Sequence, residues 1–148
     1  MNESGVIEPP TALLMYIAHR AAEARVFEAV RAAGFDDLTL AQCRLGQRLN
    51  QDGLRVTDIA EQAGVTKQTA GALVDELEAS GYVTRRSDPA DARARLVVLT
   101  ERGHALCDAA AAELAKVEDE WRAHVGAAAY DAMRDALVKL REITDPYR

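Results

Sequence analysis

The feature that most constrains this chain is a pair of short helical patterns separated by a glycine turn and followed by a hairpin pattern. The first helical pattern covers residues 58–63, and the second runs from Lys67 to about Ser80 after a turn at Gly64. Four apolar residues share one face of the second helix: Ala70, Leu73, Val74 and Leu77. Two helices joined by a tight glycine turn are the sequence form of a helix-turn-helix.

The period of the pattern changes from helical to alternating directly after this unit. Residues 82–86 and 95–99 are predicted to form two strands, and residues 87–91 between them, Ser-Asp-Pro-Ala-Asp, are typical of a turn. A hairpin after the second helix makes the unit a winged helix-turn-helix. The predicted fold class is therefore mainly α with a small β-hairpin wing.

Longer helices flank this unit on both sides. One is expected over residues 12–33, ended by Gly34, another over residues 101–125, and a last one over residues 127–143 after a break at Gly126. The apolar residues of the first helix lie on more than one face, and those of the last follow a 3-4-3 spacing. Both patterns predict burial against other helices.

Capping residues mark where several helices begin. Thr39 and Gln42 form a capping box for a short helix that is expected to run to about Asn50. The remaining expected caps, in chain order, are Thr57 or Asp58, then Thr66, then Thr100 with Glu101.

The sequence is therefore expected to divide into a winged helix-turn-helix over residues 38–100 and dimerisation helices over residues 9–36 and 101–148. The flanking helices carry more apolar surface than one small winged unit can cover, which predicts a homodimer. Seven side chains are assigned to the dimer contact: Leu13, Ile17, Trp121, Tyr130, Met133, Leu137 and Leu140.

Composition excludes several classes of protein. With 49% hydrophobic and 28% charged residues, wholesale disorder is excluded. The apolar runs are far shorter than the roughly 20 residues of a membrane span, and no basic segment followed by an apolar stretch opens the chain. Two cysteines provide neither a disulfide framework nor a metal-ligand spacing. We expect a cytoplasmic protein without cofactor, metal or membrane partner.

Four segments together resemble the MarR (multiple antibiotic resistance regulator) family. They are Val56–Thr69 (VTDIAEQAGVTKQT), Leu73–Val83 (LVDELEASGYV), Asp88–Arg93 (DPADAR) and Leu99–Gly103 (LTERG). The combination of this hairpin with the Leu-Thr-x-x-Gly that follows it is specific to the family. The resemblance implies a homodimer with interlocked first, fifth and sixth helices, and two winged units that read successive major grooves of double-stranded DNA. Many members are repressors released by small, often aromatic or phenolic, ligands.

The first turn of the second helix is the predicted base-reading segment. A recognition helix enters the major groove with its N-terminal residues, and its free backbone N–H groups favour phosphate. Gln68 suits adenine and Lys67 suits guanine or a phosphate. The assigned residues are Thr66, Lys67, Gln68 and Thr69. The next residues depart from the family pattern, with Ala-Gly-Ala at 70–72 and acids at 75 and 76.

The hairpin supplies the second predicted DNA contact. Although the chain carries a net charge of −6, residues 85–95 hold four Arg against two Asp. The resemblance places Arg93 in the minor groove at the wing tip, where narrow A·T-rich segments attract a cation, with Asp91 bonded to it. Arg85, Arg86 and Arg95 complete the expected basic surface. The alternative for Asp91 and Arg93 is an ordinary exposed turn pair.

A ligand site is predicted between the first two helices. Arginine beside histidine and tyrosine in a mostly apolar cleft suits an anionic aromatic molecule. The candidate residues are Tyr16, His19, Arg20, Arg44, Gln47 and Arg48. The alternative is that these side chains are polar members of the dimer contact.

Two other functions stay open at this point. Cys43 near a helix N-terminus, where a thiol pKa is lowered, allows a redox-sensing regulator on the same fold; buried structural cysteines, Cys43 and Cys107, are the simpler interpretation. From another class, the chain is a helical adaptor that binds protein rather than DNA, or a small helical enzyme. No catalytic triad, phosphate loop or paired carboxylates are evident, so an enzyme is not expected.

Overall fold

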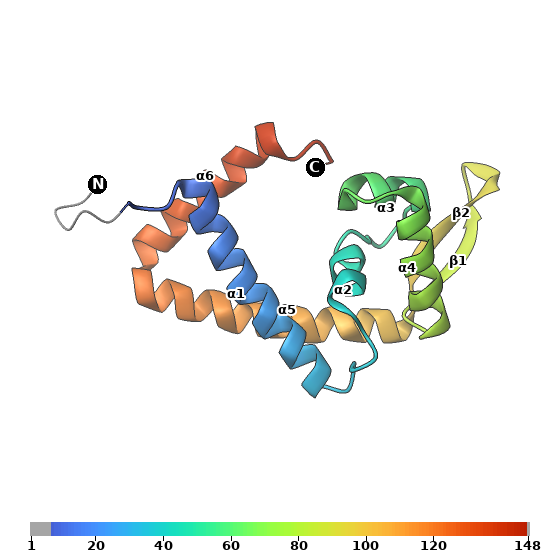
Figure 1. The fold of residues 1–148 in the computed structure, drawn as a ribbon, viewed down its shortest axis with the longest axis horizontal. Helices are drawn as coiled ribbons and strands as arrows, with labels where there is room; N and C mark the ends of the chain where they lie inside the picture. The colour runs from blue at the N-terminus through green and yellow to red at the C-terminus, as the bar shows by residue number, and fades with distance from the viewer. Residues whose placement is uncertain (1–6, 148) are drawn as a thin grey trace.

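The computed structural model describes residues 7–147, which form a helical frame and a winged unit joined by one long helix (Figure 1). The elements are α1 (Thr11–Ala32), α2 (Leu40–Gly46), α3 (Val56–Ala63), α4 (Lys67–Ala79), β1 (Val83–Asp88), β2 (Asp91–Leu99), α5 (Glu101–Val125) and α6 (Ala127–Thr144). In Figure 1 the helical frame (α1, α5 and α6) is open, and the winged unit (residues 38–100) lies over the first turns of α5. The predicted fold class is confirmed.

The helix-turn-helix forms as its sequence predicts. Gly64 ends α3 in the left-handed conformation, with φ 68° and ψ 31°, and the Val65 N–H donates to the Ala60 carbonyl at 3.0 Å. Helices often end on a glycine in this conformation, because glycine has no Cβ atom to clash with the backbone there. Thr66 then caps α4 by accepting the Thr69 N–H at 3.1 Å. The turn therefore fixes the angle at which α4 leaves α3.

One apolar cluster holds the winged unit together. The predicted stripe on α4 is confirmed, because Ala70 and Val74 are fully buried and Leu77 nearly so. The buried members of the cluster come from every element of the unit: Leu38, Leu45, Ile59, Ala60, Ala70, Val74, Leu77, Tyr82, Val83 and Val97.

Two helix boundaries differ from those that the sequence predicts, for one reason. The capping box of Thr39 and Gln42 is confirmed, but α2 ends at Gly46 rather than near residue 50. The chain then extends so that Leu54 pairs with Val97 of β2, with N···O distances of 3.2 and 2.8 Å. This bridge was not predicted.

The bridge also determines where α3 begins. Because the chain leaves Leu54 in extended form, α3 starts at Val56, with the extended Arg55 at its N-cap position. The predicted cap by Thr57 or Asp58 is wrong, since both lie inside the first turn and no side chain caps this helix.

The hairpin is longer than predicted and its turn is tighter. The strands continue to Asp88 and from Asp91, which leaves only Pro89 and Ala90 in the turn. The carboxylate of Asp88 accepts the Ala90 N–H at 2.9 Å, which stabilises the turn. The register shifts between Ser87 and Asp88, so the tip bends away from regular pairing.

Tyr82 joins the winged unit to the start of α5. Its ring is buried, its hydroxyl donates to Asp37, and the Arg102 guanidinium lies over the ring at 4.2 Å. Burial, followed by the hydrogen bond to Asp37, raises the pKa of Tyr82 to about 12. Gly103 lies against this residue, where a Cβ atom would stand 2.2 Å from the Tyr82 carbonyl oxygen. The Leu-Thr-x-x-Gly motif thus allows α5 to pack against the winged unit.

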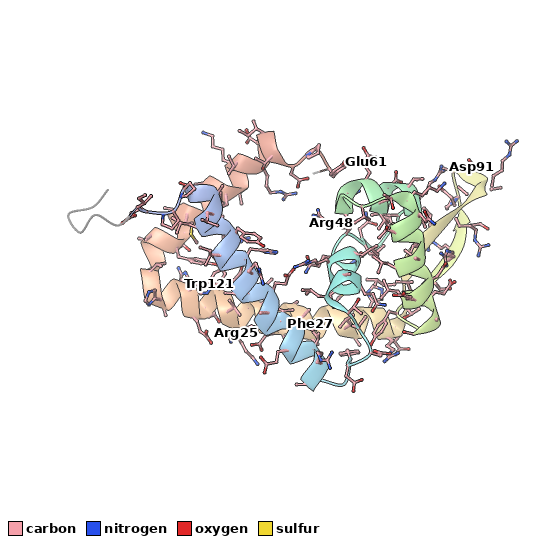
Figure 2. The ribbon with its side chains drawn as sticks, in the orientation of Figure 1. Arg25, Phe27, Arg48, Glu61, Asp91 and Trp121 are labelled. Carbon is pink, nitrogen blue, oxygen red and sulfur yellow. The ribbon has the colours of Figure 1, made fainter. Side chains whose placement is uncertain are left out.

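The helical frame is held by charge contacts between α1 and α5. Arg25 of α1 donates to Glu113 of α5 at 3.0 Å and pairs with Glu120 about two turns further along. Figure 2 shows Arg25 and Phe27 at this crossing, with Trp121 further along α5. Within residues 7–147 no helix is both long and apolar enough to cross a membrane. In the same part of the chain no three His, Cys, Asp or Glu side chains are grouped to hold a metal ion.

Candidate nucleic-acid interface and ligand cavity

The first turn of α4 presents polar side chains to solvent. All four predicted base-reading residues are exposed. Thr66 and Thr69 bond to each other, with the Thr66 hydroxyl donating to the Thr69 hydroxyl at 2.9 Å. Lys67 and Gln68 have no side-chain hydrogen bond or ion pair to any residue in the described range 7–147. This turn therefore leaves an ammonium and an amide free to bind another molecule.

The second half of α4 is occupied by a contact with the wing. The Arg85 guanidinium donates to Asp75 and to Glu78, each at 2.7 Å, and its side chain is only 22% exposed. Sequence reasoning assigned Arg85 to DNA and did not detect these partners, because they lie seven and ten positions away across a turn. The guanidinium offsets part of the negative charge on this half of α4, so it is less available for a phosphate than an unpaired arginine.

The wing tip leaves one arginine unpaired. Asp91 accepts the backbone N–H of Arg93 at 3.0 Å, so the expected bond from Asp91 to the guanidinium of Arg93 is wrong. A carboxylate two residues before an N–H closes a local turn more readily than it reaches a long side chain. No ion pair of Arg93 is found among residues 7–147. Figure 2 shows Asp91 at the end of the hairpin farthest from the frame.

The other wing arginines bind within the winged unit. Arg86 donates to the Asp52 carbonyl at 2.9 Å, and Arg95 to the Arg85 carbonyl at 3.4 Å. Both side chains are exposed, so each also has donors facing solvent.

A contact that the sequence analysis missed anchors the wing. Arg55, directly before α3, donates twice to the Asp88 carboxylate at 2.9 and 2.7 Å. The Ala90 N–H and Arg55 together hold the pKa of Asp88 below its usual value. No local pattern marks this pair, because 33 positions separate its members.

A cavity of about 390 Å³ lies between α1, α2, α5 and the base of the winged unit. Of the six predicted ligand residues, His19 and Gln47 line it, whereas Tyr16, Arg20, Arg44 and Arg48 do not. The apolar lining residues, which sequence reasoning did not assign to a ligand site, are Ala22, Val26, Phe27, Val30, Leu38, Leu40, Leu49, Leu77, Tyr82, Val83, Leu99, Leu106, Ala110, Ala111 and Leu114.

Two of the predicted ligand-binding arginines are engaged elsewhere. Arg44 donates to both oxygens of Glu23 at 2.8 and 2.6 Å, and Arg20 lies over the Tyr16 ring at 5.9 Å. The hydrogen bond from Arg44 is the main reason that the pKa of Glu23 is lowered. The structure therefore does not assemble the predicted cationic site inside the cavity.

Both cysteines line the same cavity. Burial raises the pKa of the Cys43 thiol, and the Glu23 charge raises it further; burial also raises the pKa of Cys107. A lowered Cys43 pKa is what the redox alternative requires, so the direction of the shift is opposite to that expectation. Both thiols are neutral near pH 7.

The predicted dimer residues fall into two groups. Leu13, Ile17, Met133, Leu137 and Leu140 are exposed large apolar side chains. Trp121 is half-buried and Tyr130 is buried within the single chain, so these two already have partners in the frame.

Known proteins match both the winged unit and the whole fold. Residues 36–94 match the MarR family. Over 66 residues the chain is 39% identical to an uncharacterized HTH-type transcriptional regulator, YfiV of Bacillus subtilis (strain 168). That match covers 44% of this chain and 41% of YfiV, so it spans less than half of the relative's length.

Two solved structures resemble nearly the entire chain. CouR from Rhodococcus jostii RHA1, bound to p-coumaroyl-CoA, is 25% identical with a TM-score of 0.68, over 93% of each chain. The MarR family protein Rv2887 of Mycobacterium tuberculosis, in complex with salicylic acid, is 28% identical with a TM-score of 0.62. It covers 90% of this chain and 97% of its own.

Proposed function

We propose that this chain, whose residues 36–94 match the MarR family, is a sequence-specific DNA-binding transcriptional regulator that represses its targets in the cytoplasm. It binds an inverted-repeat operator as a homodimer, and a small molecule in the cavity releases it. The first turn of α4 reads bases, and the wing enters the adjacent minor groove.

The observation that carries this proposal is that the winged unit exposes polar side chains without a side-chain partner among the described residues at two places, the start of α4 and the tip of the hairpin. Lys67 and Gln68 project from the start of a capped helix, and Arg93 lies at the tip of the neighbouring hairpin. A helix N-terminus with free donors suits the major groove, and an arginine on a projecting turn suits the minor groove. The acidic remainder of the chain then limits non-specific binding, because phosphates repel it.

Selection of DNA from a random pool tests the proposal. We expect an inverted repeat whose half-site centres are about 10 base pairs apart, since a two-fold dimer presents its two recognition helices one helical turn apart. A direct repeat, or half-sites half a turn apart, would contradict the assigned recognition helix or the dimer.

A gel shift on the selected operator at several salt concentrations gives the second measurement. Lys67→Ala with Gln68→Ala should abolish the specific shift, whereas Lys139→Ala on α6 removes the same charge away from α4 and should not. No binding to any DNA at low salt would favour the adaptor function instead, because phosphate contacts strengthen as salt falls.

A further inference from the structure

Gln42 is the one polar residue that is buried among residues 7–147, with 6% of its surface exposed. A buried amide lowers stability unless both its oxygen and its nitrogen have partners. Its amide oxygen accepts the Thr39 N–H at 2.9 Å, which completes the capping box of α2. Its amide nitrogen donates to the Glu76 carboxylate at 2.7 Å. Because the capping box uses only the oxygen, the bond to Glu76 is a separate link from the start of α2 to α4.

The Gln42–Glu76 bond holds α4 on the side away from the wing. Glu76 lies in the third turn of α4, and Glu78, two residues later, accepts a hydrogen bond from Arg85 of β1. Successive residues of a helix are rotated by about 100°, so Glu76 and Glu78 project from nearly opposite sides of α4. The recognition helix therefore lies between a link to α2 and a contact with the wing.

Of the contacts around α4, this bond is the one best suited to fix the rotation of the helix about its own axis. The packing of Val74 and Leu77 in the core is apolar and has no preferred direction. The carboxylates that bind Arg85 are exposed, and ion pairs in water contribute little. The Gln42 amide is shielded from water, and a hydrogen bond to a carboxylate is both strong and directional.

A small rotation of α4 would misplace the base-reading side chains. The tips of helix side chains lie about 5–6 Å from the axis, so a rotation of about 15° moves them by about 1.5 Å. A hydrogen bond to a base edge tolerates only a few tenths of an ångström around its usual length. Gln68, whose amide is proposed to read a base, would lose that bond, whereas contacts to the flexible, repeating phosphate backbone would adjust.

We propose that Gln42 is a positioning residue for base reading. Through its bond to Glu76 it fixes the rotation of α4, so that the amide of Gln68 meets a base edge. The inference rests on the proposed function, because it specifies how the operator is distinguished from other DNA. It also gives a role to Glu76, one of the two acids of α4 that depart from the family pattern.

Two substitutions of Glu76 remove the same charge and differ in whether they keep a hydrogen-bond acceptor. Glu76→Gln keeps an amide oxygen that can accept from Gln42, and Glu76→Ala keeps none. The readout is the ratio of operator affinity to affinity for unrelated DNA at one salt concentration, because a change of charge alters both affinities together. We expect this ratio to fall about tenfold in Glu76→Ala, as for one lost base contact, and to stay within about twofold of wild type in Glu76→Gln.

An exchange of the two side chains gives a rescue test. Gln42→Glu keeps the acceptor of the capping box but places a carboxylate against Glu76, so the ratio should fall. Adding Glu76→Gln restores a donor and an acceptor in reversed order, and the ratio should recover. Absence of recovery in a folded double variant would overturn the inference. If the charge at position 42 prevents folding, the comparison of Glu76→Ala with Glu76→Gln decides, because residue 76 is exposed.

Hydrogen exchange without DNA separates this inference from the proposed function. The backbone amides of α4 should exchange at least about threefold faster in Glu76→Ala than in Glu76→Gln, with those of α6 unchanged. Equal rates would overturn the link to α4. Equal affinity ratios, in protein that binds its operator, would overturn the positioning role and leave the proposed function standing. Wild-type protein that binds no DNA would overturn the proposed function, and the exchange rates alone would then decide whether Gln42 holds α4.

Discussion

The winged unit and the helical frame bury apolar surface to very different extents. Every member of the main core cluster lies between Leu38 and Val97, inside the winged unit. The frame, although it contains the three longest helices, buries four apolar side chains: Ala22, Val30, Val117 and Tyr130. Its exposed large apolar side chains are Leu13, Leu14, Tyr16, Ile17, Leu114, Val125, Met133, Leu137, Val138, Leu140 and Ile143.

This difference indicates that the two regions acquire stability from different sources. The winged unit has helices and a hairpin that close on one another, so its apolar faces are covered within the chain. The frame is open in Figure 1, and single helices cannot bury a two-sided apolar surface by themselves. We therefore expect the winged unit to be stable by its own packing and the frame to depend on a second copy.

Substitution of a frame residue should have the largest effect. Leu137 is 39% exposed on α6, and Leu137→Glu would bury an unpaired carboxylate in the dimer contact, at a cost of several kcal/mol. We expect the variant to dissociate or unfold when its mass is measured by light scattering at micromolar concentration. Lys139→Glu, on the same helix, should stay dimeric. A well-folded wild-type monomer under these conditions would contradict the expectation that the frame depends on a second copy.

Substitution of a core residue in the winged unit should have a smaller effect: it should lower the free energy of unfolding and leave the dimer intact. Ile59 is fully buried, and Ile59→Ala should lower the free energy of unfolding by about 2–5 kcal/mol through the cavity left behind. The exposed Thr57→Ala in the same helix should change it by no more than about 0.5 kcal/mol. Urea unfolding followed by circular dichroism gives the values. If the dimer of the Ile59→Ala variant dissociates at the same urea concentration at which the winged unit unfolds, the two regions unfold as one cooperative unit.

Substitution at the base-reading turn should alter specificity without altering either region's stability. Because residues 70–72 are Ala-Gly-Ala, we expect base readout to be concentrated on Lys67 and Gln68. Gln68→Ala should relax preference at one symmetric pair of operator positions by about 1–3 kcal/mol, with non-specific binding unchanged. Competition binding with single-base operator variants measures this. A uniform loss across all sequences would assign Gln68 to the phosphate backbone.

Substitution at the wing tip should change the salt dependence of binding. Arg93→Ala is expected to lower the slope of affinity against salt by about one unit and to weaken sites with A·T-rich flanks most. Titration at four salt concentrations provides the slope. An unchanged slope would make Asp91 and Arg93 an ordinary turn pair.

Substitution of Arg85 should have the smallest effect on DNA affinity, and its reversal by two further substitutions would reveal the role of this residue. If its role is to neutralise Asp75 and Glu78, Arg85→Ala weakens DNA binding because two carboxylates are uncovered beside the groove. Adding Asp75→Asn and Glu78→Gln to that variant should then restore affinity to near the wild-type value. Failure of the triple variant to recover would return Arg85 to direct phosphate contact. The mass of the dimer should be the same in all these variants, because the substituted residues lie in the winged unit and not in the frame.

The amino-acid sequence by itself determined the features that depend on neighbouring residues. The capping box of Thr39 and Gln42, the caps at Thr66 and Thr100, and the turn at Gly64 all form as predicted. Each cap joins a side chain to a backbone N–H three positions away, and the Gly64 turn joins backbone groups five positions apart, so the local chemistry is sufficient. The order of helices and hairpin follows from the same periodic signals.

Only the tertiary structure decided which distant groups meet. The bridge from Leu54 to Val97 accompanies the shifted end of α2 and start of α3, and Asp88 pairs with the distant Arg55 in addition to the local Ala90 N–H. Arg44, one of the three arginines predicted to bind a ligand, instead pairs with Glu23 on another helix. Such pairs depend on how the elements pack, because any acid within reach satisfies a guanidinium, and sequence spacing does not say which acid that is.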